Sequence, residues 1–203
     1  MNFSSSLIEK AVESFSTLPG IGKKTALRMV LHLIKQDPEH VQKFAHNLVN
    51  LRMNIKACQV CHNLSDADLC QICLDNSRNK MIICLVESIR DVMAIEETGQ
   101  FSGVYHVIGG ILSPIDGVGP EQLNIDSLLE RVQQNHVKEV IMAINPTIEG
   151  ETTIFYLSKR LQKYGIKVST LARGVAFGSE LEYADEITLA RSIQSRMPYN
   201  AVE

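Results

Sequence analysis

The sequence predicts an α/β protein built from a helical segment, a four-cysteine knuckle and a parallel sheet with helices on its faces. Three observations support this fold class. Two amphipathic stretches separated by a glycine-rich break open the chain, two Cys-x-x-Cys pairs follow, and from residue 81 short apolar runs alternate with helical patterns. The 203 residues are 45% hydrophobic and 21% charged, which is enough to bury a core. The predicted parts are 1–56, 57–79, 80–175 and a carboxy-terminal helical segment, 176–203.

Positive charge gathers at the amino-terminal end, although the whole chain carries a net charge of −3. Residues 1–56 hold eight Lys and Arg against four Asp and Glu, whereas residues 57–203 hold twelve against nineteen. A polyanion is therefore expected to bind the amino-terminal part. No apolar run approaches the ~20 residues of a membrane helix, and no basic segment followed by an apolar one marks a secretion signal. We expect a soluble, cytoplasmic protein without a membrane partner.

The first predicted helix begins at Ser6, because Ser6 and Glu9 have the spacing of a capping box. Apolar residues recur at helical spacing up to Leu18, and Pro19–Gly22 ends the pattern. A second helix is predicted over Lys23–Lys35. The glycines allow a positive φ and a close approach of the backbone, and the free N–H groups at the start of the second helix favour a phosphate.

The segment Leu18–Ala26, with the sequence LPGIGKKTA, resembles the helix-hairpin-helix motif of DNA repair proteins, which grips the sugar-phosphate backbone without reading bases. The resemblance implies sequence-independent DNA binding. The residues predicted for it are Gly20, Gly22, Lys23, Lys24, Thr25 and Arg28. The alternative is an ordinary helical hairpin whose lysines form a solvated face. Because each neutralised phosphate adds a slope of only about −0.9 to log K against log salt, one hairpin binds weakly, and several copies in a homo-oligomer are expected.

Four of the five cysteines form a C-x2-C-x8-C-x2-C pattern. They follow a third predicted helix, which Asp37 and Pro38 open as N-cap and first helical residue. Two residues between cysteines let both thiolates of a turn face one point, and two such turns complete a tetrahedral shell that suits Zn²⁺. The predicted ligands of one structural zinc ion per chain are Cys58, Cys61, Cys70 and Cys73. Because the shell is filled, no open position is left for a catalytic role.

Other uses of these cysteines fit the sequence less well. Disulfides do not suit a reducing cytoplasm, and a redox pair needs one Cys-x-x-Cys at the start of a helix rather than two in a short loop. An iron–sulfur cluster stays open, because a shell of four thiolates also binds iron. His62 could replace a thiolate, but four cysteines already complete the shell. Cys84 lies in an apolar run and is predicted to be a core residue.

The rest of the chain predicts a parallel α/β domain whose functional loops lie at the carboxyl ends of the strands. A long loop rich in Gly and Pro, 109–120, interrupts the alternation. The predicted strands are Met81–Val86, Tyr105–Ile108, Glu139–Ile144 and Lys167–Leu171. The predicted helices are Asp91–Thr98, Asp126–Gln134, Thr152–Tyr164 and Leu181–Arg196.

Two of these strands end in segments that resemble the Toprim domain of topoisomerases, primases and some nucleases. In that domain a glutamate after the first strand and a D-x-D-x-x-G segment after a later one bind Mg²⁺. Glu87 matches the glutamate and Gly150 the glycine, but neutral Asn145 and Thr147 stand where the aspartates would be. The loss of two negative charges disfavours Mg²⁺ binding. We therefore predict no Mg²⁺ cofactor and no enzymatic activity.

Acidic residues at this edge of the sheet, Glu87, Glu149 and Glu151, are predicted to contact a protein partner. For Glu149 and Glu151 the alternative is a favourable charge at the amino-terminal end of the helix expected from Thr152. No phosphate-binding loop is present, and no G-x-G-x-x-G follows a strand. A standard nucleotide site is therefore not expected.

In this order, a helix-hairpin-helix, a four-cysteine knuckle and a degenerate Toprim domain resemble the RecR family of bacterial recombination mediators. The segments Tyr105–Pro114 and Leu181–Ala190 add to the resemblance. It implies a non-enzymatic protein of recombinational repair, in the bacterial cytoplasm and on the nucleoid when it acts. Such a protein forms a ring-shaped homotetramer that can encircle DNA, joins RecO-like and RecF-like proteins, and helps to load RecA on single strands. The competing hypothesis is a Mg²⁺-dependent nuclease or topoisomerase-like enzyme that uses Glu87 with Glu149 and Glu151.

Overall fold

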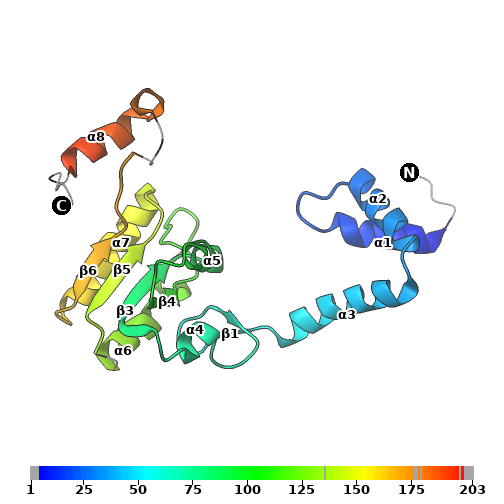
Figure 1. The fold of residues 1–203 in the computed structure, drawn as a ribbon, viewed down its shortest axis with the longest axis horizontal. Helices are drawn as coiled ribbons and strands as arrows, with labels where there is room; N and C mark the ends of the chain where they lie inside the picture. The colour runs from blue at the N-terminus through cyan, green and yellow to red at the C-terminus, as the bar shows by residue number, and fades with distance from the viewer. Residues whose placement is uncertain (1–4, 135, 176–177, 179, 197, 199–203) are drawn as a thin grey trace. The chain divides into compact units, whose positions relative to one another are not determined.

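The computed structural model divides the chain into two compact units, Met1–Ile55 and Lys56–Glu203, which are described separately (Figure 1). It describes residues 5–134, 136–175, 178, 180–196 and 198. The predicted carboxy-terminal segment therefore lies outside the described residues at 176–177, 179, 197 and 199–203. No helix in the described ranges has both the length and the apolar character needed to cross a bilayer.

The first unit is a helical hairpin followed by a longer helix. Its helices are α1 (Ser6–Ser16), α2 (Lys23–Ile34) and α3 (Pro38–Asn54). The hairpin core consists of Val12 from α1 and of Ala26 and Val30 from α2. The predicted start of α3 is confirmed, because the Asp37 side chain accepts the N–H of Glu39 at 2.9 Å with Pro38 as the first helical residue.

The capping box predicted at Ser6 is wrong. Ser5 is the N-cap of α1, its carbonyl oxygen accepts the N–H of Glu9 at 3.1 Å, and no side chain caps this end. Ser6 is already inside the helix. It is therefore one residue past the position from which a hydroxyl reaches the amide two or three residues on.

The second unit contains a four-stranded parallel sheet, which confirms the predicted parallel arrangement of the strands. The strands are β3 (Asn79–Val86), β4 (Gly103–Val107), β5 (Glu139–Ala143) and β6 (Lys167–Thr170), in the order β4-β3-β5-β6. The helices that accompany them are α5 (Ile89–Glu97), α6 (Ile125–Gln134), α7 (Ile148–Gln162) and α8 (Glu186–Gln194). Short 3₁₀ turns occupy Pro120–Gln122 and Leu181–Tyr183, so the predicted helix over Leu181–Arg196 is split in two.

Alternate side chains of β3 enter two different cores, as expected for a strand buried on both faces. Ile83 and Leu85 join the larger cluster with α6 and α7. Cys84 and Val86 join the smaller cluster, which includes Val92 of α5. The prediction that Cys84 is a core residue is thus confirmed.

Helix α7 begins at Ile148, four residues before the predicted start at Thr152. Thr147 is its N-cap, and the Thr147 hydroxyl oxygen accepts the N–H of Gly150 at 3.0 Å. Gly150 is needed there, because a Cβ would overlap the carbonyl oxygen of Asn145. This cap allows the helix to start two residues after Pro146, and it places Glu149 and Glu151 inside the first turn.

The four-cysteine segment, which follows α3 and precedes β3 in the sequence, forms a small knuckle. The antiparallel strands β1 (Lys56–Ala57) and β2 (Leu64–Ser65) frame it, and α4 (Gln71–Leu74) closes it. Its buried cluster consists of three cysteines, with Leu69, Ile72 and Cys73 packed against them. A segment with so small an apolar core depends on another source of stability.

Candidate functional site

The first candidate site is the start of α2, where backbone amides and cations occur together. Gly22 is the N-cap, no side chain caps the end, and the first turn contains no acidic residue. The amides of this turn have no intrahelical acceptor, and Lys23 and Lys24 beside them are exposed. Gly20 makes the preceding turn with φ +76°, and Thr25 is half-buried. An anion complements this arrangement.

One face of α2 carries a line of cations. Lys24, Arg28 and Lys35 border one shallow hollow together with His32, whereas Lys23 does not line it. In the described part of the chain, no carboxylate lies within 4.0 Å of these cations. Sequence reasoning missed Lys35, although eleven residues are about three helical turns and put Lys35 on the face of Lys24.

The second candidate site is the cysteine cluster, and its geometry fits a tetrahedral metal ion. The Sγ atoms of Cys58, Cys61, Cys70 and Cys73 all lie within 4.8 Å of one another, and those of Cys61 and Cys70 are 3.5 Å apart. Zn–S bonds of about 2.3 Å imply S···S separations of about 3.8 Å. Within the described residues, these four cysteines are the only group of three or more Cys, His, Asp or Glu side chains that lie close enough to bind one metal ion.

Local structure brings the four sulfurs together. The N–H of His62 donates to the carbonyl oxygen of Cys58 at 2.9 Å, which closes the first Cys-x-x-Cys turn. Cys70 is the N-cap of α4, and its N–H donates to the Cys58 sulfur at 3.3 Å. Cys73 follows within the same short helix.

Buried thiols at this spacing need a cation in order to ionise together. A hydrogen bond with Cys73 and burial raise the pKa of Cys61 far above its usual range. Burial raises the pKa of Cys70 to about 11. Although burial opposes it, the backbone amides of Cys70, Val60 and Cys61 lower the pKa of Cys58 to about 7. A divalent metal ion would compensate the four thiolate charges, as structural zinc does.

His62 is not part of the metal-ligating group. Its Nε2 is hydrogen-bonded to the hydroxyl of Ser127 in α6 at 2.8 Å. Its ring packs edge-on against that of His106, with 5.2 Å between the centroids. His106 is buried, its Nε2–H donates to the carbonyl oxygen of Asn124, and burial lowers its pKa to about 3. Both rings therefore help to seat the knuckle on the α/β unit.

The acidic residues at the strand ends do not converge on one point. The Glu87 carboxylate accepts the backbone N–H of Asn145 at 2.6 Å. Glu151 forms an ion pair with Arg173, a cation that sequence reasoning did not single out. Glu149 lies in the first turn of α7, and no ion pair or side-chain hydrogen bond involves its carboxylate among the described residues.

A cationic helical hairpin, a tetrathiolate knuckle and a parallel sheet with acidic strand ends define a helix-hairpin-helix, zinc-finger and Toprim protein. Four family models match the chain in that order. They describe the RecR helix-hairpin-helix (residues 8–52), the RecR four-cysteine zinc finger domain (55–75), the Toprim domain (81–172) and the RecR C-terminal region (174–197). The chain belongs to the RecR family.

Curated relatives agree with these matches over the full length. The Recombination protein RecR of Cytophaga hutchinsonii is 54% identical over 204 residues, which cover 100% of both chains. That of Flavobacterium johnsoniae is 57% identical over 98% of this chain and 97% of its own. That of Bacteroides thetaiotaomicron is 54% identical over 96% of this chain and 95% of its own.

Proposed function

We propose that this protein is a non-enzymatic, DNA-binding mediator of recombinational repair that works as a homo-oligomer. The observation that carries the proposal is the start of α2, where exposed backbone amides lie beside cations that form no ion pair among the described residues. The relatives named Recombination protein RecR support the process in which it acts.

DNA contact is assigned to the phosphate backbone. Lys24 and Arg28 provide the charge, Lys23 and Lys35 extend it, and the amides that follow Gly22 donate to a phosphate oxygen. Contacts of this kind position a protein on DNA without reading its sequence. The other residues proposed for this surface are Gly20 and Thr25.

The helical unit supports the proposed oligomer, because its longest helix buries none of its residues within one copy. Helix α3 spans 17 residues and none of them is buried. Its exposed side chains include Phe44, Leu48, Val49, Leu51 and Met53. Phe44, Leu48 and Leu51 recur at the spacing of one helix face, an exposed apolar face of this kind marks an interface, and a second copy would cover it. We propose a ring-shaped homotetramer that encircles DNA, since repeated weak hairpins then act together.

In the α/β unit, we propose that the acidic residues at the strand ends, Glu87, Glu149 and Glu151, contact RecO-like and RecF-like partners during the loading of RecA on single strands. Glu149 is the most available of the three, because Glu87 holds a backbone amide and Glu151 holds Arg173. The proposed site of action is the bacterial cytoplasm and nucleoid. One structural zinc ion per chain is proposed for Cys58, Cys61, Cys70 and Cys73.

The oligomer is tested by its mass with and without DNA and the RecO-like partner. We expect light scattering to find an assembly larger than one chain, and Leu48→Glu to dissociate it, because a carboxylate would enter the apolar face of α3. The control is Asn50→Glu, which adds the same charge at a polar position of the same helix. A wild-type protein that stays monomeric and ignores DNA in dilute buffer would refute the proposal.

The enzymatic alternative is tested with labelled DNA and Mg²⁺. We expect no cleavage that depends on the protein, because Glu87, Glu149 and Glu151 are held apart and Asn145 and Thr147 provide no carboxylate. Product strands are measured on denaturing gels over long incubations. Nicking that Glu87→Gln abolishes would establish the enzyme instead.

A further inference from the structure

The edge strand of the sheet, β4, is protected along its free side. All five of its residues are buried, although it stands at the end of the strand order. Its carbonyl oxygens at Gly103, Tyr105 and Val107 each accept a side-chain donor. The donors are Arg78 Nη1 at 3.2 Å, Arg131 Nη1 at 2.6 Å and Asn124 Nδ2 at 3.0 Å, respectively. An edge covered in this way cannot accept another strand.

The cysteine knuckle provides a further partner of this edge. The N–H of Val107 donates to the carbonyl oxygen of Cys61, a proposed metal ligand, at 2.8 Å. The next residue, His62, is hydrogen-bonded to Ser127 of α6. The turn that would hold the metal is therefore also the turn that closes the end of β4.

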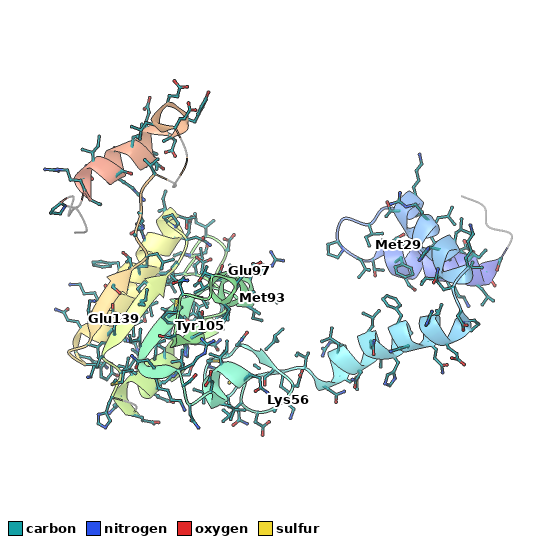
Figure 2. The ribbon with its side chains drawn as sticks, in the orientation of Figure 1. Met29, Lys56, Met93, Glu97, Tyr105 and Glu139 are labelled. Atoms are coloured by element: carbon teal, nitrogen blue, oxygen red, sulfur yellow. The ribbon has the colours of Figure 1, made fainter. Side chains whose placement is uncertain are left out.

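Arg131 of α6 links the two features. It is partly buried, its guanidinium donates to the carbonyl oxygen of Tyr105, a residue labelled in Figure 2, and no carboxylate of the described chain lies within 4.0 Å. Arg131 and Cys73 border the same hollow. Burial lowers the pKa of Arg131, whereas the nearby cysteine groups, Cys73 foremost, act in the opposite direction.

A cation in such a position normally has an anionic partner, because an unpaired buried charge is costly. A zinc ion bound by four thiolates carries a formal charge of −2 and offers that partner. We propose that Arg131 is the counter-charge of the metal-loaded cysteine cluster and that it couples metal loading to closure of the β4 edge. The inference rests on the zinc assignment and not on the DNA-binding role.

The coupling makes the effect of Arg131 depend on the metal. With zinc bound, loss of the guanidinium leaves the anionic cluster uncompensated. Without zinc, the cluster no longer holds the fixed charge of −2 of the metal complex, and the charge of Arg131 is only weakly compensated. Removing it is then neutral or stabilising, as when unpaired buried ions are replaced.

Zinc affinity of the full chain is the first test, measured by competition with a chromophoric chelator. Arg131→Gln keeps an amide donor for the Tyr105 carbonyl but removes the charge, and we expect zinc to bind about tenfold to a hundredfold more weakly. Arg131→Lys keeps the charge and is expected to retain most of the affinity. The control is Arg90→Gln, which removes an exposed charge at the start of α5.

The melting temperature separates a charge effect from a general packing effect. Arg131→Gln is expected to lower Tm in the zinc-loaded protein and to leave it unchanged or raise it after zinc removal. If Arg131→Gln lowers Tm equally with and without zinc and binds zinc as tightly as the wild type, Arg131 only donates a hydrogen bond to β4. That result would overturn the proposal.

A measurement on the wild-type protein avoids any folding defect of the variants. Hydrogen exchange at the Val107 amide is expected to accelerate when zinc is removed, because the Cys61 carbonyl that accepts this proton loses its fixed position. Unchanged protection of Val107 after zinc removal would refute the coupling. Elemental analysis that finds no zinc would instead refute the metal assignment, and DNA affinity enters neither readout.

Discussion

Replacing Lys24 and Arg28 together by glutamate is expected to lower DNA affinity roughly a hundredfold at about 0.1 M salt. The two side chains lie four residues apart on α2 and border one hollow. Each phosphate contact contributes a slope of about −0.9 in log K against log salt, so the loss of two contacts per bound hairpin also flattens the salt dependence by about two. Fluorescence anisotropy with labelled duplex and single strands at several salt concentrations measures both quantities.

The matched control is Lys159→Glu with Lys163→Glu, in the last turn of α7 and at its C-cap. This pair has the same spacing and the same change in net charge, and both lysines are exposed. If it weakens binding as much as the hairpin variant, the effect comes from the overall charge of the protein. If the hairpin variant binds DNA normally, the start of α2 is not the DNA-binding surface.

Replacing Cys58 by serine is expected to abolish stoichiometric zinc and to cost much of the folding or solubility of the protein. The buried cluster of the knuckle consists of cysteines, and its strands β1 and β2 have two residues each. Little else can therefore hold it together. Structural zinc contributes about 10–16 kcal/mol of apparent binding free energy in zinc-finger peptides, and that energy is folding energy. Elemental analysis and thermal unfolding followed by circular dichroism measure the two losses.

Cys84→Ser separates metal loss from the loss of a buried sulfur. Cys84 is buried in the sheet and is not a member of the cluster, so its variant should unfold at a lower temperature while it keeps zinc. Any soluble Cys58→Ser protein is expected to keep the intrinsic DNA contact, since α2 lies in the other compact unit. Iron in the wild-type protein, or a folded protein without metal, would contradict the assignment.

The features that sequence reasoning predicted correctly depend on residues close together in the chain. The cysteine spacing predicted the cluster, Asp37 and Pro38 predicted the start of α3, and alternating apolar patterns predicted a parallel sheet. Errors arose where a local signal had a competitor. The N-cap of α1 is Ser5 and not the predicted Ser6. Because Thr147 caps α7, that helix begins four residues before its predicted start.

Contacts between distant residues decided the rest. Glu87 is 58 positions from Asn145, yet its carboxylate holds that backbone amide, which makes Glu87 a supporting residue of the strand ends. Nothing in the spacing of Arg131 signals that it lies beside the cysteine cluster, and nothing in Cys61 signals that its carbonyl closes an edge strand.

The sequence by itself determined the three kinds of structure in this chain, the cysteine cluster and the cationic hairpin, because each depends on the chemistry of a few neighbouring residues. Only the tertiary structure decided which charges are left unpaired, which carboxylates are already occupied and how the knuckle joins the sheet. These depend on where folding brings distant side chains, since burial and pairing are properties of the packed molecule and not of any segment.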